Sequence, residues 1–506
     1  MKIQRTKNAA RNILYDGFLR LYNMLVPFVM RSIILHYLGV EYLGLSGLFS
    51  SILSFLNLAE LGVGTAMVFS MYKPIAEDDA DTICALMGLY RKFYRIIGLF
   101  IAVAGLALTP FLRNLVHGDV PPDVNLYILY FMNLASTVLT YWLFAYKNCL
   151  LHAHQRTDIG SKLALVINTV QNLLKILVLM VFHNYYLYLL VQLLSQVATN
   201  IFTAIIVSKK YPDYKPRGTL AKEKIRSITR RVRDLFTAKF ASVIFNSADT
   251  LVISSVLGLT PLAIYQNYFY IVSALKKFLD GISSSVLAGV GNSLATETME
   301  KNYNDLKKFS FLFGWLATIC SSMLLCMYQP FMLLWMGEEN LLPASCMLCF
   351  VLYFYFVLLG RPMHVFKDGA GMWHRDRFRP LVASLVNVAL NLSTVHWLGL
   401  YGVVLSSVVA AVLVDMPWLI HNLFREVFKK ELLWDYVRSM LKSLAVSAAA
   451  CAASWFLCDQ IALTLWAKLI VNAAVSFIIP NLAIFLVYRR SDLFRQSIGH
   501  FKRIFK

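Results

Sequence analysis

Long apolar runs follow one another along almost the whole chain, separated by short charged or turn-forming segments. A helix needs about 20 apolar residues to cross the hydrocarbon core of a bilayer, where each backbone polar group must be hydrogen-bonded within the span. The runs reach this length and lack the alternation of a membrane barrel. The sequence therefore predicts fourteen transmembrane helices. They cover residues 12–36, 43–69, 93–112, 124–146, 160–182, 186–207, 236–258, 264–292, 309–334, 342–366, 380–398, 400–423, 440–458 and 463–488.

The composition supports the same fold class. Of the 506 residues 58% are hydrophobic and 15% are charged, whereas about 25% of an ordinary soluble domain is charged. We therefore expect an all-α polytopic membrane protein, and we exclude a disordered chain, a small disulfide-stabilised domain and a soluble enzyme. Cys346 and Cys349 form a CxxC motif without a partner pair, which favours packed thiols over a zinc or redox site.

The net charge of +20 is explained mainly by membrane topology. With a cytoplasmic N-terminus, 39 of the 48 Lys and Arg residues fall in the tails and loops on that side, whereas the outer loops hold only Arg113 and Lys468. This asymmetry is the positive-inside rule, and it predicts both termini in the cytoplasm. The first apolar run is too long for a cleaved signal peptide, so we expect an uncleaved first span. A nucleic-acid partner is not expected.

The chain contains an internal repeat. Residues 13–40 and 232–259 align without gaps, Arg20 falls on Lys239, and both segments end near a Leu-Gly pair. The offset between the two copies corresponds to six predicted helices. Because six is an even number, the halves share one orientation, as in transporters whose parallel repeats hold a substrate between two lobes. The predicted domains are an N-terminal six-helix lobe (1–207), a basic cytoplasmic linker (208–235), a C-terminal six-helix lobe (236–424) and two extra helices with a basic tail (425–506).

Several charged side chains fall inside predicted spans. A charge at the bilayer centre costs about 2.5–3.5 kcal/mol even on lenient scales, and such a residue is a functional candidate by default. In the first span Asp16, Arg20, Asn23 and Arg31 recur at helical spacing on one face. Arg20 and its repeat equivalent Lys239 lie about a third of the way into their spans, which favours a cavity-lining role over a membrane-surface one.

Basic residues outnumber acidic ones inside the spans, which predicts a cavity for an anionic substrate. The candidate substrate-binding residues are Arg20, Lys239, Lys276, Lys277, Arg31 and Lys175. The candidates for ion coupling are Glu60, Asp249, Asp280 and Asp16. An alternative stays open for Asp16, Arg31 and Arg361, which lie near span ends and could form internal ion pairs or extend to the interface. Lys276 and Asp280 are also spaced as a helical ion pair.

Motifs for self-contained catalysis are missing. There is no phosphate-binding loop, so the sequence does not support ATP hydrolysis. Asp79-Ala-Asp81 has the form of a metal-binding motif of glycosyltransferases, but an acidic cluster is more typical of the start of a surface helix. His374-Arg-Asp376 lacks the asparagine of a kinase catalytic loop and is interpreted as a basic cytoplasmic loop. We therefore expect no enzymatic activity, no metal site and no cofactor.

Several segments resemble the polysaccharide transporter family, which consists of oligosaccharide-lipid flippases in the multidrug/oligosaccharidyl-lipid/polysaccharide exporter superfamily. They are the stretch from Leu43 to Ala66, Tyr72-Lys-Pro74 and the run from Asp249 to Tyr265. The resemblance covers nearly the whole chain. It implies a flippase that moves undecaprenyl-diphosphate-linked oligosaccharide repeat units across the bacterial cytoplasmic (inner) membrane for polysaccharide biosynthesis, by alternating access of its two lobes.

The same resemblance implies partners and site residues. The partners would be the lipid-linked oligosaccharide, membrane lipids, a polysaccharide polymerase and glycosyltransferases. Related flippases carry basic residues on the first and eighth helices of a central cavity, and Arg20, Lys276 and Lys277 match them by position. Lipid II flippases also carry a basic residue on the second helix, where this chain has Glu60. The competing interpretation is a cation-coupled multidrug antiporter of the same superfamily, which would need an acidic cavity.

Overall fold

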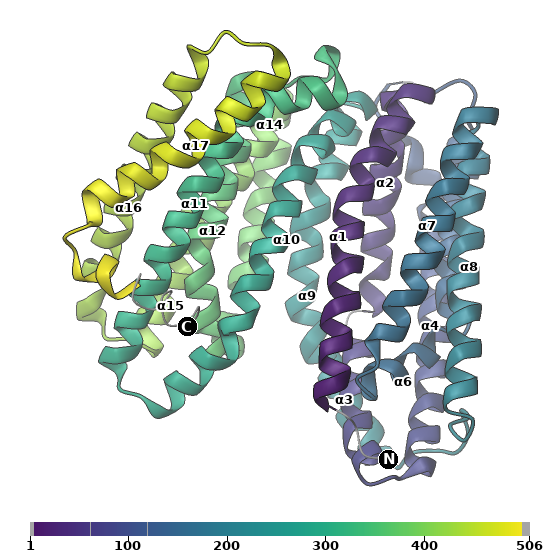
Figure 1. Cartoon of the computed structure of the whole chain (residues 1–506). Helices are drawn as coiled ribbons and strands as arrows, with labels where there is room; N and C mark the ends of the chain where they lie inside the picture. Colours follow the sequence, from purple (N-terminus) through teal and green to yellow (C-terminus); the bar gives the residue numbers. More distant parts are fainter. Residues whose placement is uncertain (1–4, 61, 119, 498–506) are drawn as a thin grey trace. The chain divides into compact units, whose positions relative to one another are not determined.

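The computed structural model describes residues 5–60, 62–118 and 120–497, apart from the side chains of a few helical residues. In this part of the chain every regular element is a helix (Figure 1). Contacts divide the chain into two compact units, Met1–Ala263 and Ile264–Lys506. The all-helical architecture confirms the predicted fold class.

The first unit is a helical bundle. Its elements are α1 (Arg5–Tyr37), α2 (Val40–Leu56), η1 (Asn57–Glu60), α3 (Val63–Ala76), α4 (Ala80–Leu108), η2 (Thr109–Leu115), α5 (Leu126–Trp142), η3 (Ala145–Lys147), α6 (Asn148–Ala153), α7 (Thr157–Phe182), α8 (Tyr185–Lys210), α9 (Lys222–Val256) and the first turn of α10 (Leu259–Thr296). α1 packs against α7, α5 packs against both α4 and α8, and α9 packs against α2 and α3. The helix that we predict to open the second lobe thus contacts helices of the first unit.

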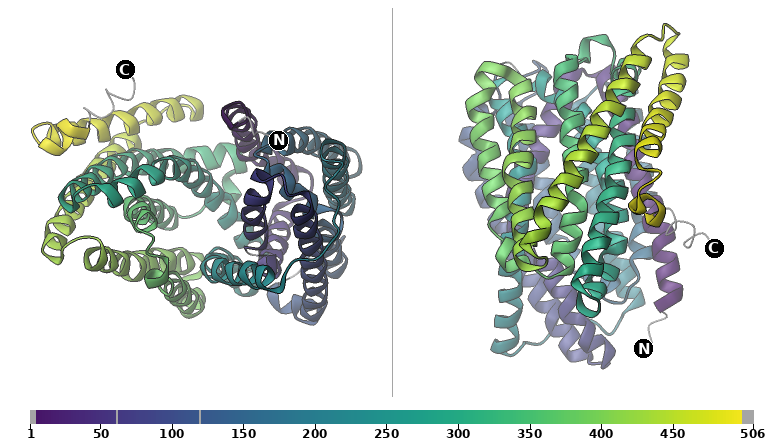
Figure 2. Two further views of the ribbon diagram at one scale, coloured as in Figure 1. Left: turned by 90° about the horizontal axis from the view of Figure 1, so that it is seen from below. Right: turned by 90° about the vertical axis from the view of Figure 1, so that its left-hand side faces the viewer.

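The second unit is arranged around one central helix. Its elements are the rest of α10, α11 (Met299–Met336), η4 (Glu338–Asn340), α12 (Ala344–Gly369), α13 (Trp373–Asp376), α14 (Arg379–Val409), the π-helical η5 (Ala410–Asp415), α15 (Met416–Glu426), η6 (Lys430–Leu432), α16 (Leu433–Asp459) and α17 (Leu465–Tyr488). α11 packs against α12, α16 and α17, and α16 and α17 lie side by side at the yellow end of the colour scale (Figure 2).

Each predicted apolar run coincides with one or more helices. Among the described residues nine helices are long and apolar enough to cross a membrane, or ten if the bent pair Leu126–Trp142 and Ala145–Ala153 forms one span. The count of fourteen therefore stays a prediction. Several helices extend far beyond their runs: α4 begins at Ala80, and α9 begins at Lys222, inside the segment predicted as a linker. Asp79 caps α4 by accepting a hydrogen bond from the Thr82 backbone N–H (2.9 Å), as the helix-start interpretation requires.

The prediction of one continuous helix over residues 43–69 is wrong. α2 ends at Leu56, a short 3-10 turn follows, and α3 begins after Gly62, whose φ of 91° lies in the left-handed region. The break places Glu60 at the end of the turn, where its side chain faces helices other than its own. A polar turn in the middle of an apolar run is tolerated in a membrane only where protein or water surrounds it.

The internal repeat is visible in the backbone. At the end of α1 the N–H groups of Leu38 and Gly39 both donate to the Ile34 carbonyl oxygen, at 2.9 and 3.1 Å. At the end of α9 Leu257 and Gly258 both donate to Ile253, at 2.8 and 3.1 Å. The two glycines have φ of 116° and 96°, which other residues rarely adopt. The aligned segments therefore end their helices in the same way.

The boundary predicted at Gly399 is confirmed. Gly399 has φ 56° and ψ −136°, so the chain reverses within α14 over one residue. The two arms are then joined by polar contacts: Asn387 Nδ2 donates to Ser407 Oγ (3.0 Å), and the Thr394 and Ser406 hydroxyls lie 3.2 Å apart. A Cβ on Gly402 would approach Thr394 Oγ1 to 2.8 Å, so only glycine permits this close approach.

The surroundings of His154 predict that the stability of the folded protein depends on pH. It lies between predicted spans, stacked on Tyr211 (ring centroids 4.4 Å apart) and hydrogen-bonded to the Leu150 carbonyl, and burial lowers its pKa below the ordinary value of about 6.5. Below that pH the unfolded chain takes up a proton that the folded protein does not, so the folded state is destabilised as pH falls. We expect the thermal midpoint in detergent to fall between pH 7.5 and pH 5.5 more steeply in the wild type than in His154→Phe. Equal slopes would contradict this role.

Candidate functional site

Two lysines that are candidate substrate-binding residues, Lys276 and Lys277, lie beside an ion pair in the second unit. Arg361 on α12 pairs with Asp280 on α10. Lys276, one turn before Asp280, interacts electrostatically with both partners but forms no ion pair within 4.0 Å among the described residues. The adjacent Lys277 is exposed. Asp280 therefore pairs with Arg361 rather than with Lys276, and neither lysine forms an ion pair within 4.0 Å among the described residues.

A second charge cluster holds the start of α14. The Arg379 side chain, 3% exposed, donates from Nε and Nη2 to both oxygens of Asp376, each at 2.8 Å, and its Nη1 pairs with Asp415. Asn422 also donates to Asp376 (3.0 Å). These contacts join α13, α14, η5 and α15. Residues 374–376, interpreted from the sequence as a basic cytoplasmic loop, form part of the short helix α13, and the Asp376 carboxylate is buried against Arg379.

The candidates on α1 have different surroundings. Asp16 accepts hydrogen bonds from Thr157 Oγ1 (2.9 Å) and from the Ser161 hydroxyl, both on α7, so it fixes the packing of these two helices. Arg20 is exposed, and none of the described residues hydrogen-bonds or pairs with it. Arg31 is half-buried and has an electrostatic partner. Arg20 is thus the α1 cation that is available to a ligand.

Lys175 is buried between α7 and α8. Its ammonium group donates to Gln192 Oε1 at 2.8 Å and lies 4.2 Å from the centre of the Tyr188 ring. The hydrogen bond and the cation–π contact stabilise the ammonium group inside the bundle. Lys239 has its side chain outside the described residues, and Asp249 is buried on α9 with a partner. Lys276 and Lys277 on α10 are thus the two adjacent basic candidates that form no ion pair within 4.0 Å among the described residues.

The remaining acidic candidate, Glu60, borders a polar cavity of about 890 Å³ inside the first unit, which we call the Glu60 cavity. Tyr94 donates to Glu60 Oε1 (3.1 Å), and Tyr90 donates to the Tyr94 hydroxyl oxygen (2.6 Å). Tyr141 lies against Tyr94 with ring centroids 5.3 Å apart and donates to Asn57 (3.1 Å). Sequence reasoning missed this tyrosine wall, although Tyr90 and Tyr94 have the spacing of one helix face.

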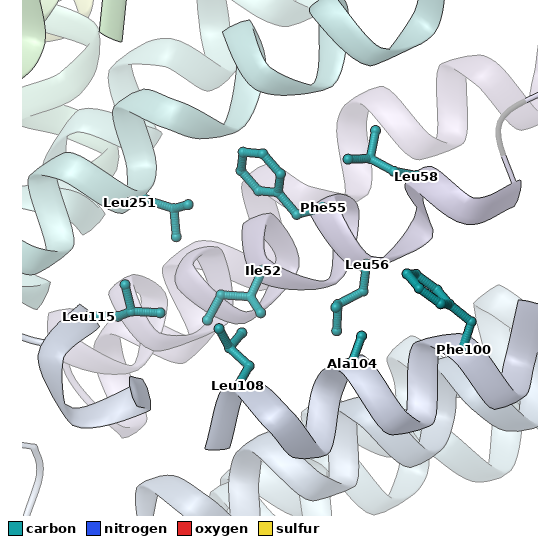
Figure 3. A pocket seen from close by; sticks show the side chains of 9 residues that line it. All are labelled: Ile52, Phe55, Leu56, Leu58, Phe100, Ala104, Leu108, Leu115 and Leu251. Carbon is teal, nitrogen blue, oxygen red and sulfur yellow. The ribbon is translucent and has the colours of Figure 1, made fainter. Parts of the chain in front are cut away.

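A second cavity of the first unit, of about 500 Å³, is purely apolar. Its lining is drawn from α2, η1, α4, η2 and α9, and every side chain is a hydrocarbon (Figure 3). The lining residues are Ile52, Phe55, Leu56, Leu58, Phe100, Ala104, Leu108, Leu115 and Leu251. Such a cavity can hold an apolar chain but cannot compensate a charged head group.

Comparison with known families decides the classification. The family model for polysaccharide biosynthesis proteins matches residues 9–288, more than half of the chain. The chain belongs to the polysaccharide biosynthesis protein family. The match includes both α10 lysines and Glu60, and it confirms the predicted family.

This polysaccharide biosynthesis protein shares its fold with solved membrane transporters. It is similar to the lipid II flippase MurJ in an inward closed conformation, with a TM-score of 0.68 and 14% identity over 94% of this chain and 98% of that one. It is also similar to an inward-facing multidrug resistance MATE family transporter of the MOP superfamily (TM-score 0.59, 15% identity, 80% and 95% covered). No curated protein matches the chain by sequence.

A third similar structure is that of a MOP superfamily transporter from Pyrococcus furiosus, which has a binding pocket of reverse polarity. It matches with a TM-score of 0.51 and 16% identity over 82% of this chain and 95% of that one. At these identities the three structures establish the fold of this polysaccharide biosynthesis protein, whereas the family match places it in polysaccharide biosynthesis.

Proposed function

We propose that this protein is a flippase for undecaprenyl-diphosphate-linked oligosaccharide repeat units. The observation that carries the proposal is the presence of Lys276 and Lys277, two adjacent lysines that form no ion pair within 4.0 Å among the described residues. The diphosphate is esterified at both ends, by the prenyl chain and by the sugar, so each phosphorus carries one ionised oxygen and the charge is about −2 near neutral pH. Two ammonium groups beside a compensated Arg361–Asp280 pair supply the matching charge. The family match supplies the link to polysaccharide precursors.

The charge of the diphosphate also determines the direction of transport that a membrane potential favours. Each elementary charge that crosses a membrane potential of 100 mV gains or loses about 2.3 kcal/mol. A potential that is negative inside therefore favours movement of a diphosphate head group from the cytoplasmic to the outer leaflet. Alternating access of two lobes in a bacterial cytoplasmic membrane, with both termini in the cytoplasm and a polymerase acting on the exported unit, completes the proposal.

The rival function is a cation-coupled multidrug antiporter. The fold that the chain shares with a MATE family transporter favours it, because one scaffold can serve either chemistry. The α10 lysines disfavour it, because they repel a cationic drug. Efflux of ethidium from proteoliposomes in exchange for Na⁺ or H⁺ would support the antiporter.

We expect native mass spectrometry of the gently purified protein to detect a bound polyprenyl-diphosphate oligosaccharide. The Arg20→Ala/Lys239→Ala variant removes the two repeat-equivalent cations, and we expect it to remain in the membrane, to lose the lipid and to abolish export. Retention of the lipid and of export by this variant would exclude these two residues from the site. Detection of ordinary phospholipid alone in the wild type would favour the antiporter.

A further inference from the structure

The Glu60 cavity has the wrong charge for the diphosphate. Among the described residues that line it there is no lysine or arginine, and Glu60 supplies the one carboxylate. A carboxylate in a partly dehydrated site repels an anion. The lining of the Glu60 cavity therefore disfavours a diphosphate and favours an uncharged ligand.

The cavity wall offers many uncharged hydrogen-bonding groups. Asn148 on α6, Gln196 on α8 and Thr65 on α3 line it, and within the described part of the chain their side chains have no hydrogen-bond partner. An amide presents both donors and acceptors, and a hydroxyl can act as either. Because the three groups lie on different helices, they can form hydrogen bonds to a ligand from several directions. The hydroxyl groups of a sugar also point in several directions around its ring.

The other part of the wall is aromatic. The rings of Tyr90 and Tyr94 have centroids 4.3 Å apart, and their hydroxyl groups form a chain that ends on Glu60. Aromatic faces pack against apolar surface while their hydroxyl edges stay polar. Sugar rings carry both kinds of surface, with C–H groups on their faces and hydroxyl groups on their edges. The Glu60 carboxylate can accept hydrogen bonds from these hydroxyl groups.

The size of the Glu60 cavity favours a sugar over a single ion as its ligand. Its volume of about 890 Å³ lies in the range of about 300–1,000 Å³ that small-molecule sites occupy. A water molecule occupies about 30 Å³, so a monovalent cation would fill only a small part of this space. The described residues also contain no cluster of three or more His, Cys, Asp or Glu side chains suited to a metal ion.

We propose that the Glu60 cavity binds the uncharged sugar part of the lipid-linked repeat unit. This inference rests on the proposed function. It makes the first unit the part of the protein that distinguishes one repeat unit from another, with Asn148 and Gln196 as specificity-determining residues and Glu60 as an acceptor for sugar hydroxyl groups.

The test compares binding of three probes to the purified full-length protein by calorimetry. The probes are undecaprenyl diphosphate, the lipid-linked repeat unit extracted from the host, and the oligosaccharide released from it by mild acid. Asn148→Ala/Gln196→Ala removes two amides from the cavity. Asn168→Ala is the matched control, because this half-buried amide of α7 also lacks a partner among the described residues but lies outside the cavity.

We expect the double variant to bind the lipid-linked repeat unit about tenfold more weakly, since it loses two hydrogen bonds of about 0.5–1.5 kcal/mol each. Its affinity for undecaprenyl diphosphate should not change, and Asn168→Ala should match the wild type for all probes. Unchanged affinity of the double variant for the lipid-linked repeat unit would overturn the sugar site.

The remaining outcomes separate this inference from the proposed function. If the wild type binds neither lipid, the flippase function fails, and the released oligosaccharide alone decides the sugar site: binding that the double variant loses supports it, and no binding overturns it. If instead tetraphenylphosphonium binds and Glu60→Gln abolishes this binding, the cavity is a site for organic cations and the sugar proposal is overturned.

Discussion

The Lys276→Gln/Lys277→Gln variant is expected to transport the lipid-linked repeat unit roughly 100-fold more slowly than the wild type. A hydrogen bond to a charged group contributes about 1.5–3 kcal/mol, and each 1.4 kcal/mol is a factor of ten, so two lysine–phosphate contacts account for at least this loss. The measurement is the initial rate of flipping in proteoliposomes with a potential that is negative on the side of the added lipid.

Two controls make the result specific. Lys276→Arg/Lys277→Arg keeps both charges and should retain most of the rate. Lys307→Gln removes a lysine that already pairs with Asp435 (2.8 Å) outside this cluster, and it should transport like the wild type. If the Lys276→Gln/Lys277→Gln variant flips at the rate of the wild type, the lysines of α10 are not the diphosphate site.

Arg379→Ala is expected to lower the free energy of unfolding by about 3–5 kcal/mol. The substitution removes the buried cation that Asp376 and Asp415 both contact and leaves Asp376 with the more distant Lys367 (3.5 Å), and loss of one partner of a buried ion pair has a cost of this size. Urea unfolding in detergent, followed by fluorescence, measures the change.

The neighbouring Arg375 provides the matched control. It also pairs with a carboxylate, Glu426, but its side chain is 63% exposed, so Arg375→Ala should cost less than about 1 kcal/mol. A triple variant, Arg379→Met with Asp376→Asn and Asp415→Asn, should recover much of the lost stability because no charge is left unpaired. Equal losses for the two single alanine variants would show that burial of Arg379 has no energetic consequence.

Much of the fold follows from local sequence. Hydrophobic length is a property of consecutive residues, so each apolar run coincides with helical structure, and the repeat is reproduced in the hydrogen bonds that close α1 and α9. Hydropathy says little about helix beyond the apolar part, which is why α9 begins before its predicted run, whereas the acidic cluster at Asp79 indicates the start of α4. The interruption at Gly62 is not evident from hydropathy because only two polar residues of the turn, Asn57 and Glu60, lie within a long apolar run.

The site was predictable only in part. Lys276, Lys277 and Asp280 were identified from charges at helical spacing on a predicted span. The partner of Asp280 was not, because Arg361 is 81 residues away and only the packing of α12 against α10 brings it near. The Glu60 cavity was also missed. Its tyrosines and amides look like ordinary core residues, and their common function depends on a tertiary arrangement.

The reversal at Gly399 has a mechanical consequence. The arms of α14 are tied by the Asn387–Ser407 and Thr394–Ser406 contacts and have no flexible loop between them. Displacement of one arm therefore moves the other arm with it. Arg379, at the start of α14, pairs with Asp376 on α13 and with Asp415 in η5, so the same displacement reaches both of these elements.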